Sequence, residues 1–322
     1  MSAGPANRGV FLDLGTVDNG DLDRSCLERV VGEWRWHEHT GQDQIIERIR
    51  GADVVVSNKC VFSREILAQA SDLRLLSLVA TGTDNIDLEA AHDRGVTVCN
   101  IRDYCSESVA QHTITLMLSL LTGLPWYWRQ VRAGEWSRAM QFCLNDRPIR
   151  EARGLVFGVV GYGSLGRAAA DRARGLGMEV IVAERRGVAP RPGRLSFDEV
   201  IRRSDVLSLH CPLNSETRGL IDRNVLDRMK SDAVLINTAR GGIVVEEDLA
   251  NALRAGDIAG AGVDTLSREP PPADHPLLAE DIPNLLVTPH NAWASRTARQ
   301  AGLEQVARVI AGFLAGEPIN RV

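Results

Sequence analysis

The chain has 322 residues, of which 44% are hydrophobic and 25% charged, a composition that suits a globular protein with two cores. Its formal net charge is −5, so there is no excess of positive charge to attract nucleic acid or an anionic membrane. Residues 1–15 lack a basic segment followed by an apolar run, which argues against a secretory signal. We therefore expect a cytoplasmic protein without nucleic-acid or membrane partners.

The cysteines are scattered, with neither a CxxC pair nor a Cys/His cluster at the spacing of metal ligands. We interpret them as reduced thiols, most of them in the core, and expect no bound metal. A reactive cysteine is the alternative. The residues are Cys26, Cys60, Cys99, Cys105, Cys143 and Cys211.

The first block of the chain alternates apolar runs with helical patterns, which predicts a parallel sheet covered by helices on both faces. The runs typical of strands lie at 9–14, 53–56, 73–79 and 95–98. The helical patterns lie at 22–31, 42–50, 63–71 and 87–94.

Residues 108–128 carry no formal charge and are nearly long enough to span a bilayer. Polar residues such as Gln111, His112 and Ser119 recur through the segment, and Pro125 interrupts its end. A helix buried between domains or subunits fits this pattern better than a membrane span.

The second block repeats the alternation more strongly, and its six predicted strands match the strand count of a dinucleotide-binding domain. Strands are predicted at 155–160, 179–183, 205–210, 233–237, 258–263 and 285–288. Helices are predicted at 164–175, 196–203, 222–229 and 246–255, the last with Gly256 as its C-cap. An amphipathic pattern at 295–315 predicts a final helix that returns to cover the first domain.

A GxGxxG motif, formed by Gly161, Gly163 and Gly166, follows a predicted strand and opens a predicted helix. In this context the motif predicts dinucleotide binding, with the pyrophosphate at the helix N-terminus. An acidic residue, Glu184, ends the next strand and should accept hydrogen bonds from the adenosine ribose. The alternative is a turn with no ligand.

Polar residues follow the other strands of this block where each strand ends, and these ends share one edge of a parallel sheet. Arg240 can bind a carboxylate and a carbonyl oxygen, because its guanidinium is a fork of donors. His290 can donate a proton, and Glu269 would favour the imidazolium form that does so. Taken singly, each residue also has a purely structural interpretation. Arg240 can form a surface ion pair, His290 can be a hydrogen-bonded polar residue, and Glu269 can cap a loop.

The chain resembles the D-isomer-specific 2-hydroxyacid dehydrogenases along essentially its whole length. The resemblance rests on VVGYGSLG, LHCPLNSETRGLI, LINTARGGIVVEEDLANAL, GAGVDTLSREPPP and VTPHNAWAS. It implies that Arg240, Glu269 and His290 are catalytic. It also implies a cofactor site that comprises Gly161, Gly163, Ser164, Leu165, Gly166, Glu184, Cys211, Pro212, Thr217, Thr238, Ala239, Arg240, Asp264 and His290.

In the first domain, residues 80–85 look like the family's substrate loop, where backbone N–H groups bind the carboxylate. The resemblance implies that Thr81 and Gly82 bind substrate together with Arg240 and His290, whereas a simple turn is the alternative. ATGTDNIDLEAA, NIRDYCSESVAQH, VRAGEW and AERRG look most like the glycerate dehydrogenase (hydroxypyruvate reductase) branch. Hydroxypyruvate and glyoxylate are the substrates that this resemblance favours.

The resemblance also implies a homodimer, in which the helix at 108–122 packs against the partner. Many relatives have Asp where this chain has Glu184, and Arg185 and Arg186 follow it. A glutamate still accepts hydrogen bonds from a ribose diol, so NAD is the expected cofactor. NADP is the alternative, because the two arginines can bind a 2′-phosphate.

The expected architecture is α/β, with two doubly wound parallel-sheet lobes. A Rossmann-type NAD(P)-binding domain (104–291), which includes the dimerisation helix, is inserted into a flavodoxin-like substrate-binding domain (1–103 and 292–322). The active site is expected in the cleft between them. One alternative is a D-3-phosphoglycerate dehydrogenase without a regulatory domain; the single helix after His290, which leaves no room for that domain, argues against it, although short versions exist. The other is an NAD-sensing, corepressor-like binding protein on the same fold.

Overall fold

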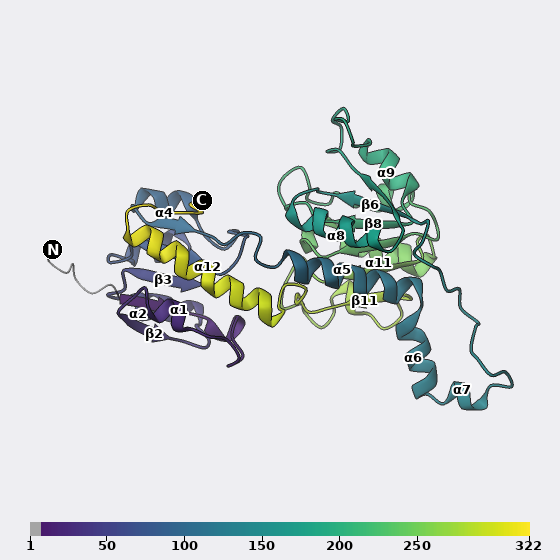
Figure 1. Ribbon diagram of the computed structural model, residues 1–322, viewed down its shortest axis with the longest axis horizontal. Helices are drawn as coiled ribbons and strands as arrows, with labels where there is room; N and C mark the ends of the chain where they lie inside the picture. Colours follow the sequence, from purple (N-terminus) through teal and green to yellow (C-terminus); the bar gives the residue numbers. More distant parts are fainter. Residues whose placement is uncertain (1–7) are drawn as a thin grey trace. The chain divides into compact units, whose positions relative to one another are not determined.

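The computed structural model describes residues 8–322 and divides into two compact units (Figure 1). Unit 1 comprises Met1–Cys105 and Ala294–Val322, and unit 2 comprises Ser106–Trp293. Residues 1–7, on which the expectation about a secretory signal partly rests, lie outside the described residues.

Unit 1 is built on a five-stranded parallel sheet with the order β2-β1-β3-β4-β5. Two of its interior strands, β3 and β4, are buried along their whole length, which explains why they form continuous apolar runs in the sequence. The strands are β1 (Arg8–Phe11), β2 (Glu33–Trp36), β3 (Val54–Ser57), β4 (Leu75–Leu78) and β5 (Thr97–Cys99).

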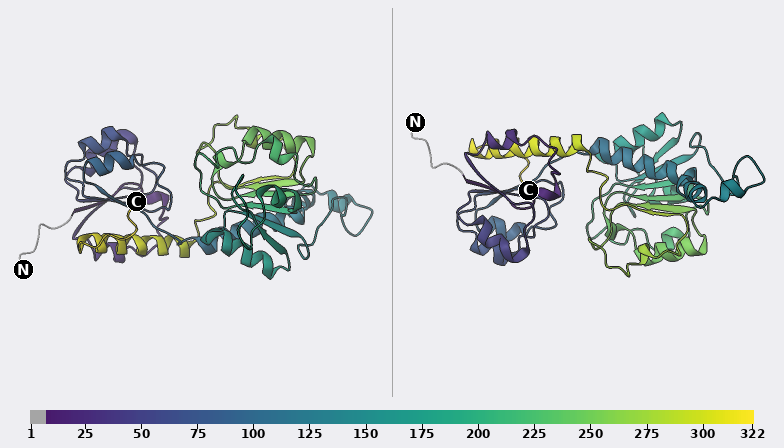
Figure 2. Two further views of the ribbon diagram at one scale, coloured as in Figure 1. Left: turned by 90° about the horizontal axis from the view of Figure 1, so that it is seen from above. Right: turned by 90° about the horizontal axis from the view of Figure 1, so that it is seen from below.

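Helices cover both faces of this sheet (Figure 2). One face carries α2 (Ile45–Ile49), α3 (Arg64–Gln69) and α4 (Leu88–Asp93), and the other carries α1 (Ser25–Glu28) and α12 (Arg296–Leu314). Two 3-10 turns, η1 (Leu14–Thr16) and η2 (Gln42–Gln44), complete the unit.

The C-terminal helix α12 packs on unit 1, as its amphipathic pattern predicted. Ser295 caps it by accepting the Ala298 N–H at 3.2 Å. Its buried residues Leu303, Val306 and Ile310 belong to the same core cluster as residues of β1, β3 and β4. The helix therefore joins the end of the chain to the sheet formed by its beginning.

Unit 2 is built on a six-stranded parallel sheet with the order β11-β10-β9-β8-β6-β7. All six predicted strands are confirmed, each to within two residues at either end. They are β6 (Val156–Val160), β7 (Glu179–Val182), β8 (Val206–Leu209), β9 (Val234–Asn237), β10 (Gly260–Val263) and β11 (Leu285–Val287).

Two sets of helices sandwich the second sheet (Figure 2). One face is covered by α5 (Ser106–Leu121) and α8 (Ser164–Gly175), the other by α9 (Phe197–Arg203), α10 (Arg223–Leu226) and α11 (Glu246–Ala255). The 3-10 turns η3 (Gly241–Ile243) and η4 (Pro276–Leu278) lie in its loops. Gly256 ends α11 with φ 74°, as expected of a C-cap glycine.

The uncharged segment at 108–128 forms parts of two helices, not one. Gly123, with φ 63°, separates α5 from α6 (Leu124–Arg132), which α7 (Glu135–Arg138) follows. Figure 1 shows α6 and α7 projecting away from the sheet of unit 2. Within the described part of the chain, no helix is both long enough and apolar enough to cross a bilayer.

Candidate active site

The predicted site residues of unit 2 follow strands whose carboxyl ends share one edge of the sheet. In the sheet order, β9, β10 and β11 are neighbours, and they lead into Arg240, Asp264 and His290 respectively. Strands in a sheet lie about 4.8 Å apart, so the turns after β9 and β11 are separated by roughly 10 Å. Side chains on these two turns can face a small molecule from two sides.

The glycine motif forms a tight turn between β6 and α8. Gly161 has φ 92°, and a Cβ on it would lie 2.5 Å from the backbone nitrogen of Cys211. A Cβ on Gly166 would lie 2.1 Å from the carbonyl oxygen of Gly161. Only glycine fits at these two positions, because the chain there touches backbone atoms.

The start of α8 has the features of a phosphate site. A Cβ on Gly163 would meet nothing within 4 Å, so the backbone is open to a ligand there. No acidic residue lies in the first turn of α8, and no side chain caps its N-terminus. The N–H groups beginning at Ser164 and Leu165 therefore face this space with the positive end of the helix dipole, which fits a pyrophosphate.

Glu184 lies just beyond β7, where the adenosine ribose was expected, but its carboxylate is already occupied. Its Oε2 accepts a hydrogen bond from Arg191 Nε at 2.5 Å, and its Oε1 accepts from Arg191 Nη2 at 2.8 Å. Oε1 also accepts the Arg185 backbone N–H at 3.0 Å. The Arg191 side chain and the Arg185 backbone hold the pKa of Glu184 at about 2, well below its usual range.

The arginines that follow Glu184 contribute differently from what the sequence suggested. The Arg186 guanidinium lies 5.8 Å from the ring centroid of Phe197. The side chain that donates hydrogen bonds to Glu184 is that of Arg191, a residue that the sequence alone did not single out. Its only signal in the sequence was its position between two prolines, Pro190 and Pro192.

The turn that carries Arg240 is held by Asn237, the last residue of β9. Asn237 Oδ1 accepts the Ala239 N–H at 3.1 Å, and its Nδ2 donates to the Arg240 carbonyl at 2.9 Å. A Cβ on Gly241 would lie 2.0 Å from the carbonyl carbon of Leu266. This contact presses the Arg240 turn against the start of the loop that carries Glu269.

His290 and Glu269 form a close pair, in which His290 Nδ1 lies 2.5 Å from Glu269 Oε2. The other oxygen of Glu269 accepts the Leu266 N–H at 2.8 Å, which fixes the carboxylate. The two side chains are 26% and 34% exposed, so the pair remains accessible. Because Nδ1 is engaged by Glu269, the imidazole presents Nε2 as the nitrogen for exchange of a proton with a ligand.

Asp264 positions the turn that carries His290. Its carboxylate accepts the N–H groups of Asn291 at 3.1 Å and Ala292 at 3.0 Å, together with the Thr288 hydroxyl at 2.5 Å. Its carbonyl accepts the His290 N–H at 2.8 Å. These bonds hold His290 at φ 51°, a conformation that a residue other than glycine rarely adopts.

A second histidine at this edge, His210, is buried and has different properties. Burial lowers its pKa to about 4, and its Nε2 lies 2.8 Å from the Ser208 hydroxyl. His210 is therefore neutral near pH 7 and cannot serve as an imidazolium acid there. Of these two histidines, His290 is the one that fits the role of acid.

The remaining predicted cofactor residues line the same edge. Thr238 is buried, and its hydroxyl lies 3.0 Å from that of Thr113 on α5. The Thr217 hydroxyl donates to the carbonyl of Pro212 at 2.6 Å and so closes the loop after β8. Burial raises the pKa of Cys211 to about 11, which keeps its thiol protonated and argues against a reactive cysteine there.

The predicted substrate loop lies in unit 1 and follows β4. The Thr81 hydroxyl donates to the Ile101 carbonyl at 2.9 Å, and Asn100 Nδ2 donates to the Thr81 carbonyl at 2.7 Å. These hydrogen bonds fix the loop through the hydroxyl and the carbonyl of Thr81, and they do not involve the backbone N–H groups of Thr81 and Gly82.

Lys59, a cationic residue that was not predicted from the sequence, follows the neighbouring strand β3. Its backbone N–H donates a hydrogen bond to the buried Asp13.

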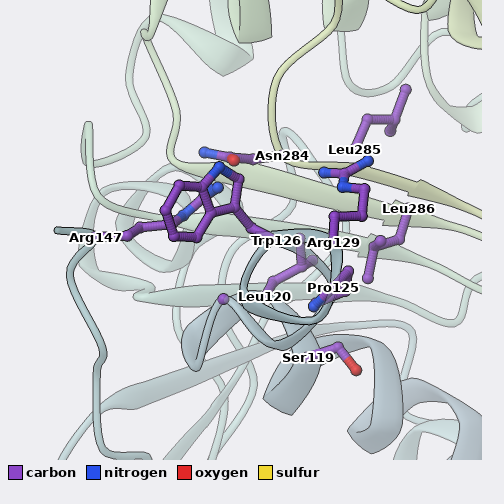
Figure 3. A pocket seen from close by; sticks show the side chains of 10 residues that line it. Ser119, Leu120, Pro125, Trp126, Arg129, Arg147, Asn284, Leu285 and Leu286 are labelled. Atoms are coloured by element: carbon purple, nitrogen blue, oxygen red, sulfur yellow. The ribbon is translucent and has the colours of Figure 1, made fainter. Parts of the chain in front are cut away.

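A cavity elsewhere in unit 2 lacks the groups for this chemistry. It encloses about 270 Å³, including its open mouth, between the end of α5, α6 and the start of β11. Figure 3 shows Trp126 beside Arg147, whose guanidinium lies 6.0 Å from the indole ring, and Arg129 is also in the lining. Neither a histidine nor a carboxylate lines it, so the candidate active site stays at the carboxyl edge of the sheet. Among residues 8–322, no three His, Cys, Asp or Glu side chains are grouped as ligands for a metal.

Comparison with known proteins places the chain in a family. Residues 114–292 match the NAD binding domain of the D-isomer specific 2-hydroxyacid dehydrogenases. The chain is 41% identical to a glycerate dehydrogenase of Methylorubrum extorquens, over 94% of this chain and 97% of the relative. It is 33% identical to a hydroxypyruvate reductase of Blautia hydrogenotrophica, over 97% and 98%.

A solved structure from Thermus thermophilus, that of the protein TT0316, has the same fold. It is 34% identical, superposes with a TM-score of 0.85, and the match covers 98% of this chain and 99% of that one. The chain therefore belongs to the D-isomer specific 2-hydroxyacid dehydrogenase family, whose members are NAD(P)-dependent oxidoreductases that act on a CH–OH group.

Proposed function

We propose that this enzyme interconverts small 2-keto acids and D-2-hydroxy acids, with hydroxypyruvate and glyoxylate as its main keto-acid substrates. The observation that carries the proposal is the His290–Glu269 pair, at 2.5 Å, on the sheet edge that also carries Arg240. The names of the two relatives, a glycerate dehydrogenase and a hydroxypyruvate reductase, support hydroxypyruvate, whereas glyoxylate rests on the family resemblance.

Each proposed catalytic residue has one task in the reduction. When bound, the dihydronicotinamide supplies the hydride that adds to the carbonyl carbon. Arg240 binds the substrate carboxylate and polarises the carbonyl through its fork of N–H donors. His290 donates the Nε2 proton to the carbonyl oxygen, and Glu269 stabilises the imidazolium before transfer and orients the ring.

The start of α8 is the proposed pyrophosphate site, and Glu184 is proposed to face the adenosine ribose. Its negative charge disfavours a 2′-phosphate, and Arg191 compensates part of that charge, so NADH should be preferred to NADPH less strongly than by an unpaired carboxylate. We expect this preference to be modest, about tenfold in kcat/KM, which corresponds to about 1.4 kcal/mol. Thr81 and Gly82 are the proposed unit 1 contacts of the substrate carboxylate.

The experiment is a rate assay in which NADH oxidation is followed with hydroxypyruvate, glyoxylate, pyruvate and 3-phosphohydroxypyruvate. We expect the highest kcat/KM with hydroxypyruvate or glyoxylate. The highest value with the phosphorylated substrate would instead identify a 3-phosphoglycerate dehydrogenase. NADH binding without turnover of any of the four would identify a nucleotide-sensing protein.

The His290→Gln variant tests the assignment of the acid. Loss of a positioned proton donor should reduce kcat by roughly 10²–10⁴-fold. NADH affinity, measured by fluorescence titration, should stay close to that of the wild type. Turnover near the wild-type rate in the folded variant would disprove the role of His290.

We propose that the enzyme is a homodimer in the cytoplasm. The apolar residues Val109, Leu116 and Met117 of the expected interface helix α5 are buried within their own unit. Seven of the fourteen exposed large apolar side chains among the described residues instead lie on residues 124–149, here called the arm, which includes α6 and α7. They are Leu124, Trp128, Val131, Trp136, Met140, Phe142 and Ile149. A second copy covering the arm would remove this apolar surface from water.

The six free cysteines support the cytoplasmic location, since reduced thiols persist in a reducing compartment.

A further inference from the structure

The carboxylate proposed to bind the adenosine ribose is nearly saturated by its own loop. Glu184 is 1% exposed, whereas the Arg191 side chain above it is 62% exposed. A carboxylate has about four acceptor sites, and Arg191 and the Arg185 N–H already use three of them. A ribose diol that donates two hydrogen bonds must therefore compete with Arg191 for Glu184.

The loop that carries Arg191 holds the arginine in this position. Pro190 and Pro192 flank it, and they restrict the backbone of the residues around Arg191. The Arg194 N–H donates to the Arg191 carbonyl at 3.0 Å, which makes a turn. The end of the loop is closed by a parallel bridge between Ala183 and Leu195. The pairing of Arg191 with Glu184 is therefore supported by the backbone and does not depend only on a flexible surface side chain.

The pairing of Arg191 with Glu184 also changes the net charge beside the proposed position of the adenosine ribose. An unpaired carboxylate would repel a 2′-phosphate, but here the neighbouring guanidinium compensates its charge. A guanidinium has five N–H donors, and Glu184 accepts from only two groups of Arg191, Nε and Nη2. The others remain for a phosphate, which guanidinium groups bind in a bidentate manner. Arg194 adds a second cation, with its Nη1 3.8 Å from Glu184 Oε1.

We propose that Arg191 determines the cofactor specificity of this enzyme, because it withdraws Glu184 from the ribose diol and offers its guanidinium to a 2′-phosphate. The inference rests on the proposed cofactor site, which it deepens. Arg191 thus reduces the preference for NADH that Glu184 alone would impose, so the wild type binds both nucleotides. Arg185 and Arg186 have no such role, since Arg185 reaches Glu184 through its backbone and Arg186 lies over Phe197.

The test is a set of dissociation constants for NADH and NADPH, measured by nucleotide fluorescence on the intact enzyme. Arg191→Ala should weaken NADPH binding at least about tenfold, the equivalent of one charge-assisted hydrogen bond. It should leave NADH binding unchanged or tighter, because Glu184 becomes available to the diol. Arg191→Gln, which keeps a hydrogen-bond donor but no charge, should also lose affinity for NADPH and serves if the alanine variant folds poorly.

Arg185→Ala is the matched control, since it removes one positive charge from the same loop. It should leave both dissociation constants within about twofold of the wild type, allowing for long-range screening. Equal weakening of both nucleotides in Arg191→Ala and Arg191→Gln, or a larger effect of Arg185→Ala on NADPH, would overturn the inference. A wild type that binds neither nucleotide would refute the proposed cofactor site itself, which is a different result.

Discussion

At the scale of single residues, burial decides which histidine at the sheet edge can act as an acid. His210 and His290 both follow strands of the unit 2 sheet. Burial lowers the pKa of His210 to about 4, whereas His290 is partly exposed and paired with Glu269. The same residue type therefore has a structural role at one strand end and a proposed catalytic role at another.

The buried His210 predicts a pH dependence of stability. Its pKa is about 4 in the folded protein and 6.5 when unperturbed, so the unfolded chain binds the proton first as the pH falls. The stabilisation is fully present above pH 6.5, and about 2 kcal/mol of it should be lost between pH 7 and pH 5. Glu184, with a pKa near 2, loses its contribution only at lower pH.

Urea unfolding at pH 7, 6 and 5 measures this loss. His210→Gln should flatten the dependence over that range, whereas substitution of the exposed His39 by Gln should leave it as in the wild type. A variant at His210 with the same slope as the wild type would show that its burial does not control stability in this range.

A prediction for Arg240 follows from the shape of its side chain. Arg240→Lys keeps the positive charge but removes the planar fork that binds a carboxylate in a bidentate manner. We expect kcat/KM for the keto acid to fall about 10- to 100-fold, the equivalent of one charge-assisted hydrogen bond. The dissociation constant of NADH serves as the control and should change little. Nearly full activity in this variant would mean that Arg240 acts only as a point charge.

At the scale of elements, the turn between β6 and α8 contains two glycines that are needed for different reasons. Gly166 is required for packing, because a Cβ there would lie 2.1 Å from the Gly161 carbonyl oxygen. Gly163 is different, because a Cβ there would meet nothing within 4 Å of protein. Gly166 is therefore needed for the packing of the helix on the strand, whereas Gly163 leaves space for a ligand.

This difference predicts opposite outcomes for two alanine variants. Gly166→Ala should lower the thermal unfolding temperature, because the helix must shift away from the strand. Gly163→Ala should unfold at the wild-type temperature yet bind NADH at least about tenfold more weakly, because its methyl group occupies the space proposed for the pyrophosphate. Differential scanning fluorimetry and fluorescence titration measure the two effects. Unchanged NADH affinity in Gly163→Ala would contradict the proposed position of the pyrophosphate.

At the scale of the whole molecule, the arm carries large apolar side chains that the rest of unit 2 does not bury. Met140 and Phe142 are about as exposed as in an extended chain, at 103% and 90%. Large apolar side chains in such a position add nothing to the stability of the monomer. Their presence fits a surface that is buried by a second copy of the chain.

The double variant Met140→Ser/Phe142→Ser tests the dimer. Each apolar side chain contributes roughly 1.5–3 kcal/mol when it is buried, so the dissociation constant of the dimer should rise at least about 100-fold. Sedimentation velocity measures the change, and Val61→Ser, an exposed apolar residue of unit 1, is the control. A wild type that is monomeric, or a variant that associates as strongly, would refute the arm as the interface.

The alternation of strands and helices, and the residues that follow the strands of the second sheet, could be predicted from the sequence. These features depend on contiguous segments: apolar runs make buried strands, and turn residues follow them. The strand β2 was missed, because its residues Glu33–Trp36 form a short, partly exposed strand at the sheet edge without a clear apolar run. The helices α6 and α7 were not predicted as separate elements. The apolar residues Leu124, Trp128 and Val131 of α6 do recur at helical spacing, but Pro125 was interpreted as an interruption of the preceding segment, whereas it lies in the first turn of α6.

How the site residues are paired and how deeply they are buried could not be predicted from the sequence. The pairing of Arg191 with Glu184 closes a loop, and the pairing of His290 with Glu269 joins two loops. The hold of Asp264 on the His290 turn joins the ends of two strands. The low pKa of His210 comes from the residues packed around it. Such contacts depend on which segments the fold brings together and how far it excludes water from them, and the local pattern of residues carries neither.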